Sequence, residues 1–550
     1  MGTLALHTIP FLLLSIGLQP GIRLATESDN QELNYLKFVF DATEFSSSEE
    51  YDYIVVGGGT AGCPLAATLS TNYSILLLER GGDAHDNPNV IRQERILLSL
   101  LEADDKDSPA QGFTSEDGIQ NARARVLGGG SMINLGFYSR ADQDFYMSSG
   151  IKWDMAVVNN SYEWVEESIV FRPILGSWQS SVKEALLESG VGPDNGFTLD
   201  HLEGTKIGGS IFDRMGRRHG AVELLNKAEP KNLRVAIHAT VERLIFTSSK
   251  SLGLSAVGVI YRDSKGRFHE ARVRGRGEVI LSAGAIGSPQ VLLLSGIGPK
   301  QYLSSMNITV VHHQPYVGQF MQDIPRNGIN FVAPFAMAEA EFGSQVVGII
   351  RDGTYVESLS GVIPFYSPAA SPILFPDPSP PVNISVMTIV KKNPRPRSTG
   401  LLQLASPTNI MVSPIVRFNY FANPLDLLHC GNTMRNVGKM LRTRAMEQYK
   451  FRDTDGTKYF KFVGWPLPGN ESDEVVMESF CRKTLTTYWH YHGGCLVGKV
   501  VDDAFRAIGI NSLRIVDGST FRVSPGTNPQ ATLMMLGRYV GLKMQEERMS

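Results

Sequence analysis

The residues best suited to chemistry lie near the C-terminal end of the chain, where His490 and His492 stand two positions apart. An imidazole titrates near neutral pH, so His490 can act as a general base toward a hydroxyl group. On a strand, both rings would point to the same side. A histidine packed in a core is one alternative, and a metal-binding pair is another. No third ligand with suitable spacing is evident, so we predict no metal site.

Two aromatic residues precede the first of these histidines. Tyr488 and Trp489 can line a pocket for an aromatic substrate, and the Tyr488 hydroxyl can bond to a substrate oxygen. Packing in a hydrophobic core is the alternative for both side chains.

A glycine-rich turn near the other end of the chain forms the second chemical cluster. Gly57, Gly59 and Gly62 follow the apolar run Tyr51–Val56 and open an expected helix. In that context they match a dinucleotide-binding fingerprint, in which glycines allow the turn, the approach of a pyrophosphate and close helix–strand packing. Glu79 ends the next apolar run, where its carboxylate can accept hydrogen bonds from ribose hydroxyls.

The surrounding pattern indicates which elements hold these residues. Tyr51–Val56, the helix after it and Ser74–Leu78 form a βαβ unit. Residues 230–285 alternate like strands, residues 305–480 are rich in Pro and β-branched residues, and a helix is expected over Ala531–Arg548. We predict an α/β fold, α+β overall, with a discontinuous Rossmann-type domain. Its segments are 48–150, 210–304 and 482–550, and a sheet-based substrate domain takes 151–209 and 305–481.

Length and charge narrow the class of protein. A chain of 550 residues is long enough for two domains. The net charge of -3 gives no reason to expect nucleic acid or an anionic membrane as a partner. We expect a monomer that acts on a small molecule.

The N-terminus reads as a secretory signal, because Leu4–Leu18 is mostly apolar and small residues follow near Ala25. A membrane anchor is the alternative, but it would need about 20 apolar residues. We therefore predict a signal peptide over 1–25, no membrane span, and a location outside the cell, in the cell wall or in the vacuole. Five glycosylation triplets support this weakly, at Asn72, Asn159, Asn307, Asn383 and Asn470.

Four cysteines are present. Cys430 and Cys481 lie in the same C-terminal region and can form one disulfide in an oxidising compartment. Cys63 and Cys495 are expected to pack as small apolar groups.

Two longer motifs carry a family resemblance. Arg125–Asn134 and Gly284–Gln290, the latter continuing to Pro299, resemble the two signatures of the glucose–methanol–choline (GMC) oxidoreductases. The resemblance runs from about residue 48 to the end, and it implies an FAD-binding domain with an inserted substrate domain. Asn134 stands where some members tether FAD through a histidine, so we expect non-covalent FAD.

The resemblance also implies which residues contact the cofactor. They would be Gly57, Gly59, Thr60, Ala61, Gly62, Glu79, Arg80, Val126, Gly130, Ser131, Asn134, Leu135, Gly136, Phe137, Val241, Trp489, His490, Asp517, Gly518, Asn528, Pro529 and Gln530. Asn528 is also a good N-cap for the helix that Pro529 begins, and capping alone is an alternative role for it.

Within the family, the motifs are similar to plant FAD-containing (R)-mandelonitrile lyases and to HOTHEAD-type proteins. The first resemblance implies cleavage of an aromatic cyanohydrin, with His490 as base and Tyr488 and Val356 beside the substrate. The second implies oxidation of an aromatic or long-chain alcohol by the same base. Asn528 replaces the second histidine of the lyases and is expected to act with His490 as a catalytic residue, because its amide can bond to the substrate oxygen. Val356 replaces their cysteine. A protein without catalytic activity is a third possibility, which the intact motifs oppose.

Overall fold

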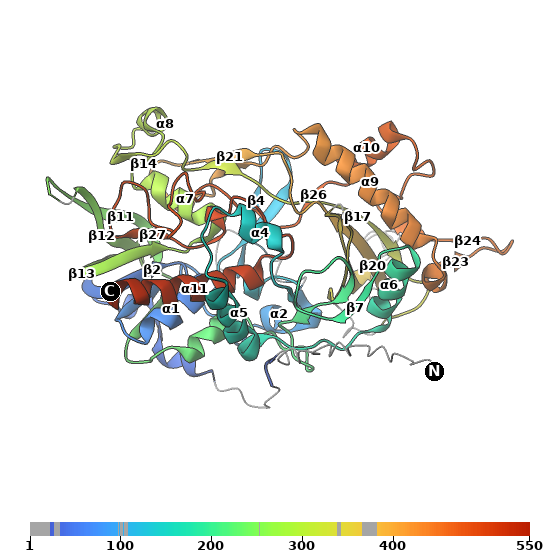
Figure 1. Ribbon diagram of the computed structural model, residues 1–550, viewed down its shortest axis with the longest axis horizontal. Helices are drawn as coiled ribbons and strands as arrows, with labels where there is room; N and C mark the ends of the chain where they lie inside the picture. The colour runs from blue at the N-terminus through green and yellow to red at the C-terminus, as the bar shows by residue number, and fades with distance from the viewer. Residues whose placement is uncertain are drawn as a thin grey trace, which may run out of the picture.

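The computed structural model shows two large sheets, each carrying its own helices (Figure 1). It describes residues 23–26, 33–96, 98, 103, 108–251, 253–337, 343–351, 353–365 and 382–549. Most of the predicted signal peptide and the side chain of Asn383 lie outside the described residues. No helix among the described residues is long and apolar enough to cross a membrane.

The first sheet holds the predicted βαβ unit. Strand β2 (Ser48–Val56) leads through α1 (Gly62–Ser70) to β3 (Ile75–Leu78), and the two strands are parallel. The strand order is β1 (Val39–Asp41), β10 (Leu233–Ile237), β3, β2, β13 (Phe268–Leu281), β12 (Gly253–Arg262) and β11 (Thr240–Ser249), and β27 (Leu513–Ile515) also pairs with β13. All four residues of β3 are buried, which explains their continuous apolar run.

One strand of this sheet is longer than the sequence predicts. The runs near 269–273 and 279–281 join as the single strand β13, with a register shift between Val273 and Glu278. Gly277 lies inside the shift, and a Cβ there would come within 2.2 Å of the Asp52 carbonyl oxygen. A glycine at this position therefore allows the bulge within the strand.

The C-terminal helix covers the helix of the βαβ unit. The C-terminal helix α11 (Gln530–Met549) packs against α1 and against α5 (Met155–Ile169), as Figure 1 shows. A Cβ at Gly537 would lie 2.1 Å from the Ala61 carbonyl oxygen, so a glycine allows α11 to approach the first turn of α1. The expected terminal helix is confirmed, beginning one residue early.

The second sheet is mostly antiparallel. Its order is β25 (Lys461–Val463), β17 (Pro325–Val332), β20 (Val382–Lys392), β19 (Tyr355–Phe365), β18 (Val346–Ile349), β8 (Gly204–Ile207) and β7 (Asp194–Phe197), and β26 (Thr486–Thr487) also pairs with β17. Helices α6 (Ser177–Glu188) and α9 (Pro424–Leu441) pack on it. The presence of two sheets fits the predicted division into two domains, whose boundaries stay a prediction.

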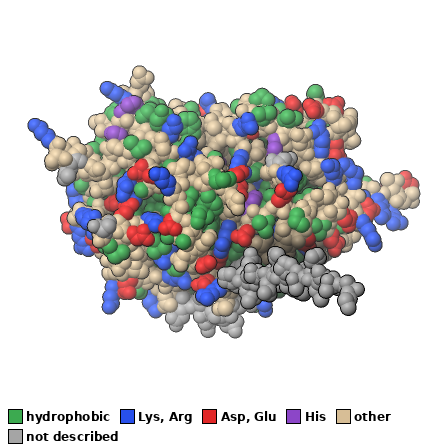
Figure 2. All heavy atoms as spheres, in the orientation of Figure 1, with side chains coloured by type: hydrophobic (Ala, Val, Ile, Leu, Met, Phe, Trp, Pro, Cys, Tyr) green, Lys and Arg blue, Asp and Glu red, His purple; other side chains and the backbone are tan. Residues whose placement is uncertain are grey.

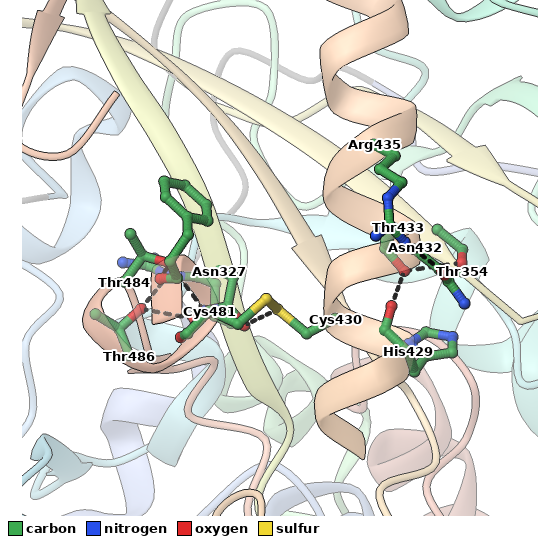
Figure 3. The surroundings of a disulfide bond; sticks show 12 residues. Asn327, Thr354, His429, Cys430, Asn432, Thr433, Arg435, Cys481, Thr484 and Thr486 are labelled. Carbon is green, nitrogen blue, oxygen red and sulfur yellow. Dashed lines mark hydrogen bonds between the residues drawn. A yellow bond between two sulfur atoms is a disulfide. The ribbon is translucent and has the colours of Figure 1, made fainter. Parts of the chain in front are cut away.

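A disulfide joins α9 to a second helix beside this sheet. Cys430 of α9 is bonded to Cys481 of α10 (Glu474–Lys483), with Cα atoms 6.2 Å apart (Figure 3). The Asn327 side chain of β17 donates to the Cys481 carbonyl oxygen at 2.7 Å, which ties the bridge to the sheet. The predicted pairing is present, and Cys63 and Cys495 are free and buried.

The visible surface carries no dominant charge. Figure 2 shows acidic and basic side chains interspersed with hydrophobic ones on one face of the molecule. Among the described residues, no group of three His, Cys, Asp or Glu side chains is arranged to hold a metal ion.

Candidate functional site

A long cavity is lined by residues of both sheets and by the start of α11. Twenty-one residues predicted to contact the cofactor or substrate line it. They are Gly57, Gly59, Thr60, Ala61, Glu79, Arg80, Val126, Gly130, Asn134, Leu135, Gly136, Phe137, Val241, Tyr488, Trp489, His490, Asp517, Gly518, Asn528, Pro529 and Gln530. The structure thus brings together segments from both ends of the chain.

The glycines of the fingerprint are needed by the geometry. Gly57 has φ +104°, and a Cβ there would lie 2.4 Å from the Ser282 carbonyl oxygen. A Cβ on Gly62 would lie 2.0 Å from the Gly57 carbonyl oxygen, so helix and strand could not pack so closely. Gly59 differs, because its Cβ would meet nothing closer than 3.8 Å and would project into the cavity that Gly59 lines.

Glu79 stands where a ribose would be bound. Its Oε2 accepts from the Gly58 amide at 3.0 Å and its Oε1 from the Gly81 amide at 2.8 Å. Burial raises the pKa of this carboxyl, although those amide bonds lower it. Each oxygen keeps a lone pair for a ribose hydroxyl.

A hydrogen-bonded joint connects the first signature to the last helix. Asn134 Nδ2 donates to Gln530 Oε1 at 2.8 Å, and Gln530 Nε2 donates to the Phe137 carbonyl oxygen at 2.6 Å. The Arg218 guanidinium donates to Asn134 Oδ1 at 3.0 Å. Asn134 is therefore fixed in the cavity wall.

Asp517 joins the second signature to the end of β27. Its Oδ2 accepts from the Gly284 amide at 2.9 Å and from Ser288 Oγ at 2.5 Å, both in α7 (Gly284–Leu294). Its Oδ1 accepts from the Ser519 amide at 2.8 Å. Burial raises the pKa of Asp517, while these bonds oppose that shift.

These residues fit a flavin dinucleotide. The wall at Gly59 lacks a side chain where a pyrophosphate would approach, and the first turn of α1 follows it directly. Helix N-termini favour anionic groups through their free amides and dipole. Residues Gly57–Ala61 would hold the pyrophosphate and Glu79 the ribose, and the wall from Gly130 to Phe137 would contact the flavin.

His490 lies at the other end of the set, after β26. Its amide donates to Asp323 Oδ1 at 3.1 Å, whereas its Nδ1 is buried without a hydrogen-bond partner in the described chain. Burial, and then the positive charge of Lys392, hold the pKa of His490 well below its usual range. The imidazole is therefore neutral and able to accept a proton.

The segment around His490 is not the strand that the spacing suggested. β26 ends at Thr487, and Trp489 has φ +56°, a left-handed conformation that breaks the alternation. His490 and His492 still both line the cavity, and His492 Nδ1 lies 3.1 Å from the His490 carbonyl oxygen. Burial lowers the pKa of His492 to about 4.

A buried ion pair, not predicted from the sequence, supports the site. Lys392 Nζ lies 3.2 Å from Glu357 Oε1 and donates to Asn528 Oδ1 at 2.7 Å. The Tyr488 hydroxyl donates to Glu357 Oε2. Burial lowers the pKa of Lys392 to about 8. The lysine pair that follows the alternating segment 382–390 was the only sequence signal for it.

Three predicted residues have other positions. Val356 is fully buried in the core between the second sheet and its helices, because side chains alternate along β19 and its neighbours Tyr355 and Glu357 take the opposite face. It does not line the cavity, so its assignment beside the substrate is corrected. Ser131 is buried under the loop, where its Oγ accepts from the Ala221 amide at 2.8 Å. Gly62 does not line the cavity, and its lack of a side chain lets helix α1 pack closely against the turn.

Comparison with known proteins places this architecture in a family. The family model of the GMC oxidoreductases matches the chain in two parts, over residues 51–326 and 396–537. The chain belongs to the GMC oxidoreductases. The predicted resemblance is confirmed, and with it an enzyme that binds FAD.

Several relatives of this GMC oxidoreductase match nearly its whole length. Sinalpyl alcohol oxidase Nec3 of Nesocodon mauritianus is 56% identical over 100% of this chain and 99% of that protein. An (R)-mandelonitrile lyase-like protein of Arabidopsis thaliana is also 56% identical, over 94% of each chain. Protein HOTHEAD of the same plant is 44% identical, over 93% of each.

Solved structures support the fold of this GMC oxidoreductase. A formate oxidase variant of Aspergillus oryzae gives a TM-score of 0.75 at 18% identity, covering 92% of this chain and 99% of that chain. Pyridoxine 4-oxidase gives 0.74 at 18% identity, covering 90% and 99%.

Proposed function

We propose that this GMC oxidoreductase oxidises a primary aromatic alcohol, with His490 as the base. The observation that carries the proposal is the bond from Lys392 Nζ to Asn528 Oδ1. An ammonium can only donate, so the amide oxygen of Asn528 is occupied and its N–H groups are what it can offer a substrate. An amide donor can hold an alcohol oxygen without titrating.

The division of labour between the two residues follows from their surroundings. His490, neutral because its pKa is depressed, accepts the hydroxyl proton. Asn528 donates to the same oxygen and stabilises the negative charge that develops there. Bound FAD supplies the acceptor for the hydride. The 56% identity to sinalpyl alcohol oxidase Nec3 supports an aromatic alcohol as substrate.

Cleavage of an aromatic cyanohydrin is a second candidate function. The observation in its favour is Lys392, a buried ammonium 2.7 Å from Asn528, whose charge would stabilise a departing cyanide. Against it, Asn528 cannot protonate the leaving group as a histidine could. The 56% identity to an (R)-mandelonitrile lyase-like protein supports this second candidate.

The two functions are distinguished by mixing the purified, FAD-loaded enzyme, in the absence of oxygen, with a substrate of each class. A substituted benzyl alcohol should remove the oxidised-flavin absorbance and yield an aldehyde. (R)-Mandelonitrile should release little benzaldehyde or cyanide. Rapid release of both with the flavin absorbance intact would replace oxidation by lyase chemistry.

Two variants identify the catalytic residues. His490→Ala should lower kcat by at least a factor of about 100 with FAD still bound, since a positioned base contributes 100 to 10,000-fold. Asn528→Ala should lower kcat less, because a neutral hydrogen bond contributes less than proton transfer. The variant His313→Ala, which removes an exposed histidine, serves as the control and should change neither kcat nor the bound FAD. Unchanged turnover in His490→Ala would refute its role.

A further inference from the structure

Arg326 of β17 is a cation in the cavity wall without a close counter-ion. Its Nε donates to Thr486 Oγ1 at 2.9 Å. Nη1 and Nη2 have no acceptor among the described residues, and no described carboxylate lies within 4.0 Å of the guanidinium. A guanidinium presents these two nitrogens as a fork that matches oxygen acceptors.

The neighbouring charges are already engaged elsewhere. Arg326 is directly opposite Lys392 in the pairing of β17 with β20, so the two cations share one face of the sheet. Glu357 is used by Lys392 and by Tyr488. Asp323 accepts from Thr487 Oγ1 at 2.6 Å, from the His490 amide and from the Tyr420 hydroxyl.

An aromatic side chain lies against this guanidinium. The Arg326 Cζ is 5.4 Å from the centre of the Trp489 ring, and Trp489 is 37% exposed although it lines the cavity. Tyr488 and His490 are the neighbours of Trp489 in the sequence, and the centres of their two rings are 4.8 Å apart. Arg326 therefore stands beside the aromatic part of the cavity, on the second sheet, whereas the pyrophosphate would lie at Gly57–Ala61 of the first.

We infer that Arg326 binds an oxygen substituent of the substrate other than the reacting hydroxyl. The inference rests on the proposed alcohol oxidation and names its substrate class, an aromatic alcohol bearing a carboxylate or a methoxyphenol group. The ring packs beside Trp489, the substituent accepts from the free guanidinium nitrogens, and the hydroxyl reaches His490.

The test compares 4-(hydroxymethyl)benzoate and 4-hydroxy-3-methoxybenzyl alcohol with benzyl alcohol. In Arg326→Met, the preference in kcat/KM for at least one oxygen-bearing substrate over benzyl alcohol should fall at least about tenfold, since a charged hydrogen bond is lost. The substrate whose preference falls more identifies the substituent that Arg326 binds. The inference is overturned if, for both oxygen-bearing substrates, the preference over benzyl alcohol is the same before and after the substitution.

Binding provides a measurement that does not depend on turnover. 4-Methylbenzoate and 4-methylguaiacol carry the same substituents and cannot be oxidised at a hydroxymethyl group. Their Kd, read from the perturbed flavin spectrum, should rise about tenfold in Arg326→Met for the preferred substituent and less in Arg326→Lys. This result would stand even if the enzyme oxidises no alcohol, so the two failures are distinguishable.

A control variant and a check on the cofactor complete the design. Arg417→Met removes an arginine that pairs with Glu116 outside the cavity, and it should leave both the preference and the Kd unchanged. If Arg326→Met instead loses FAD or shifts the flavin spectrum without ligand, the guanidinium serves the cofactor and the inference is overturned.

Discussion

At the scale of single residues, the site depends on which groups keep their charge. His490 is neutral because burial and Lys392 both disfavour its cation, and Asn528 is oriented by the same lysine. One buried ammonium thus acts on the base and on its partner. Glu357 makes that burial tolerable by pairing with Lys392.

The depressed pKa of His490 predicts a pH profile. Because the folded imidazole resists protonation, kcat/KM for the preferred alcohol should stay level as pH falls through 6.5 and should decline only at lower pH. In Lys392→Met the cation is gone, so the pKa of His490 rises and the acidic decline should move to higher pH.

The measurement is kcat/KM against pH for the unaltered enzyme and the variant with one substrate. Lys231→Met, which removes an exposed lysine, is the control and should leave the profile in place. A decline that starts at or above pH 6.5 in the unaltered enzyme, or that stays fixed in Lys392→Met, would contradict the explanation.

At the scale of elements, the second sheet separates two environments by alternation. One face carries Arg326, Lys392 and Glu357, of which Arg326 lines the cavity, and the other packs Val356 against the helices. The disulfide between α9 and α10 lies on the helix-covered side. It should therefore affect stability more than catalysis.

Replacing both Cys430 and Cys481 by Ser should destabilise the fold by about 2–4 kcal/mol, because the bridge closes a long loop and restricts the unfolded chain. Their sequence separation is 51. Thermal unfolding of both proteins, with and without reductant, measures the difference. Reductant should lower the Tm of the unaltered enzyme only, and an equal Tm for all four samples would refute the role.

At the scale of the whole molecule, a secreted monomer is expected. The acceptor residues Asn72, Asn159, Asn307 and Asn470 are all exposed, so each is accessible to glycan transfer. Protein secreted from plant cells should shift to lower mass on enzymatic deglycosylation and then sediment as a monomer lighter than the 60.4 kDa of the full chain, because residues 1–25 are removed. A chain without residues 1–25 should stay inside the cell and keep its mass. Glycan-free protein from both would contradict the secretory route.

The sequence predicted what depends on local spacing. The turn at Gly57–Gly62 and the βαβ unit around it follow from neighbouring residues, and the family resemblance extended this to Asn134 and Asp517. The contact of Lys392 with Asn528 joins residues 136 positions apart, and Arg326 faces the cavity only because of its register with Lys392. Such partners are fixed by sheet pairing, which no local pattern contains.

The joint from Asn134 to Gln530 has a consequence for biosynthesis. The two partners lie 396 positions apart, so the cavity wall joins an early segment of the chain to β27 and the start of α11. A nascent protein that has been synthesised only through the glycine turn lacks the base, its amide partner and Asp517. We therefore expect FAD to bind only after these later segments have joined the turn, and a chain shortened before β27 should not retain FAD.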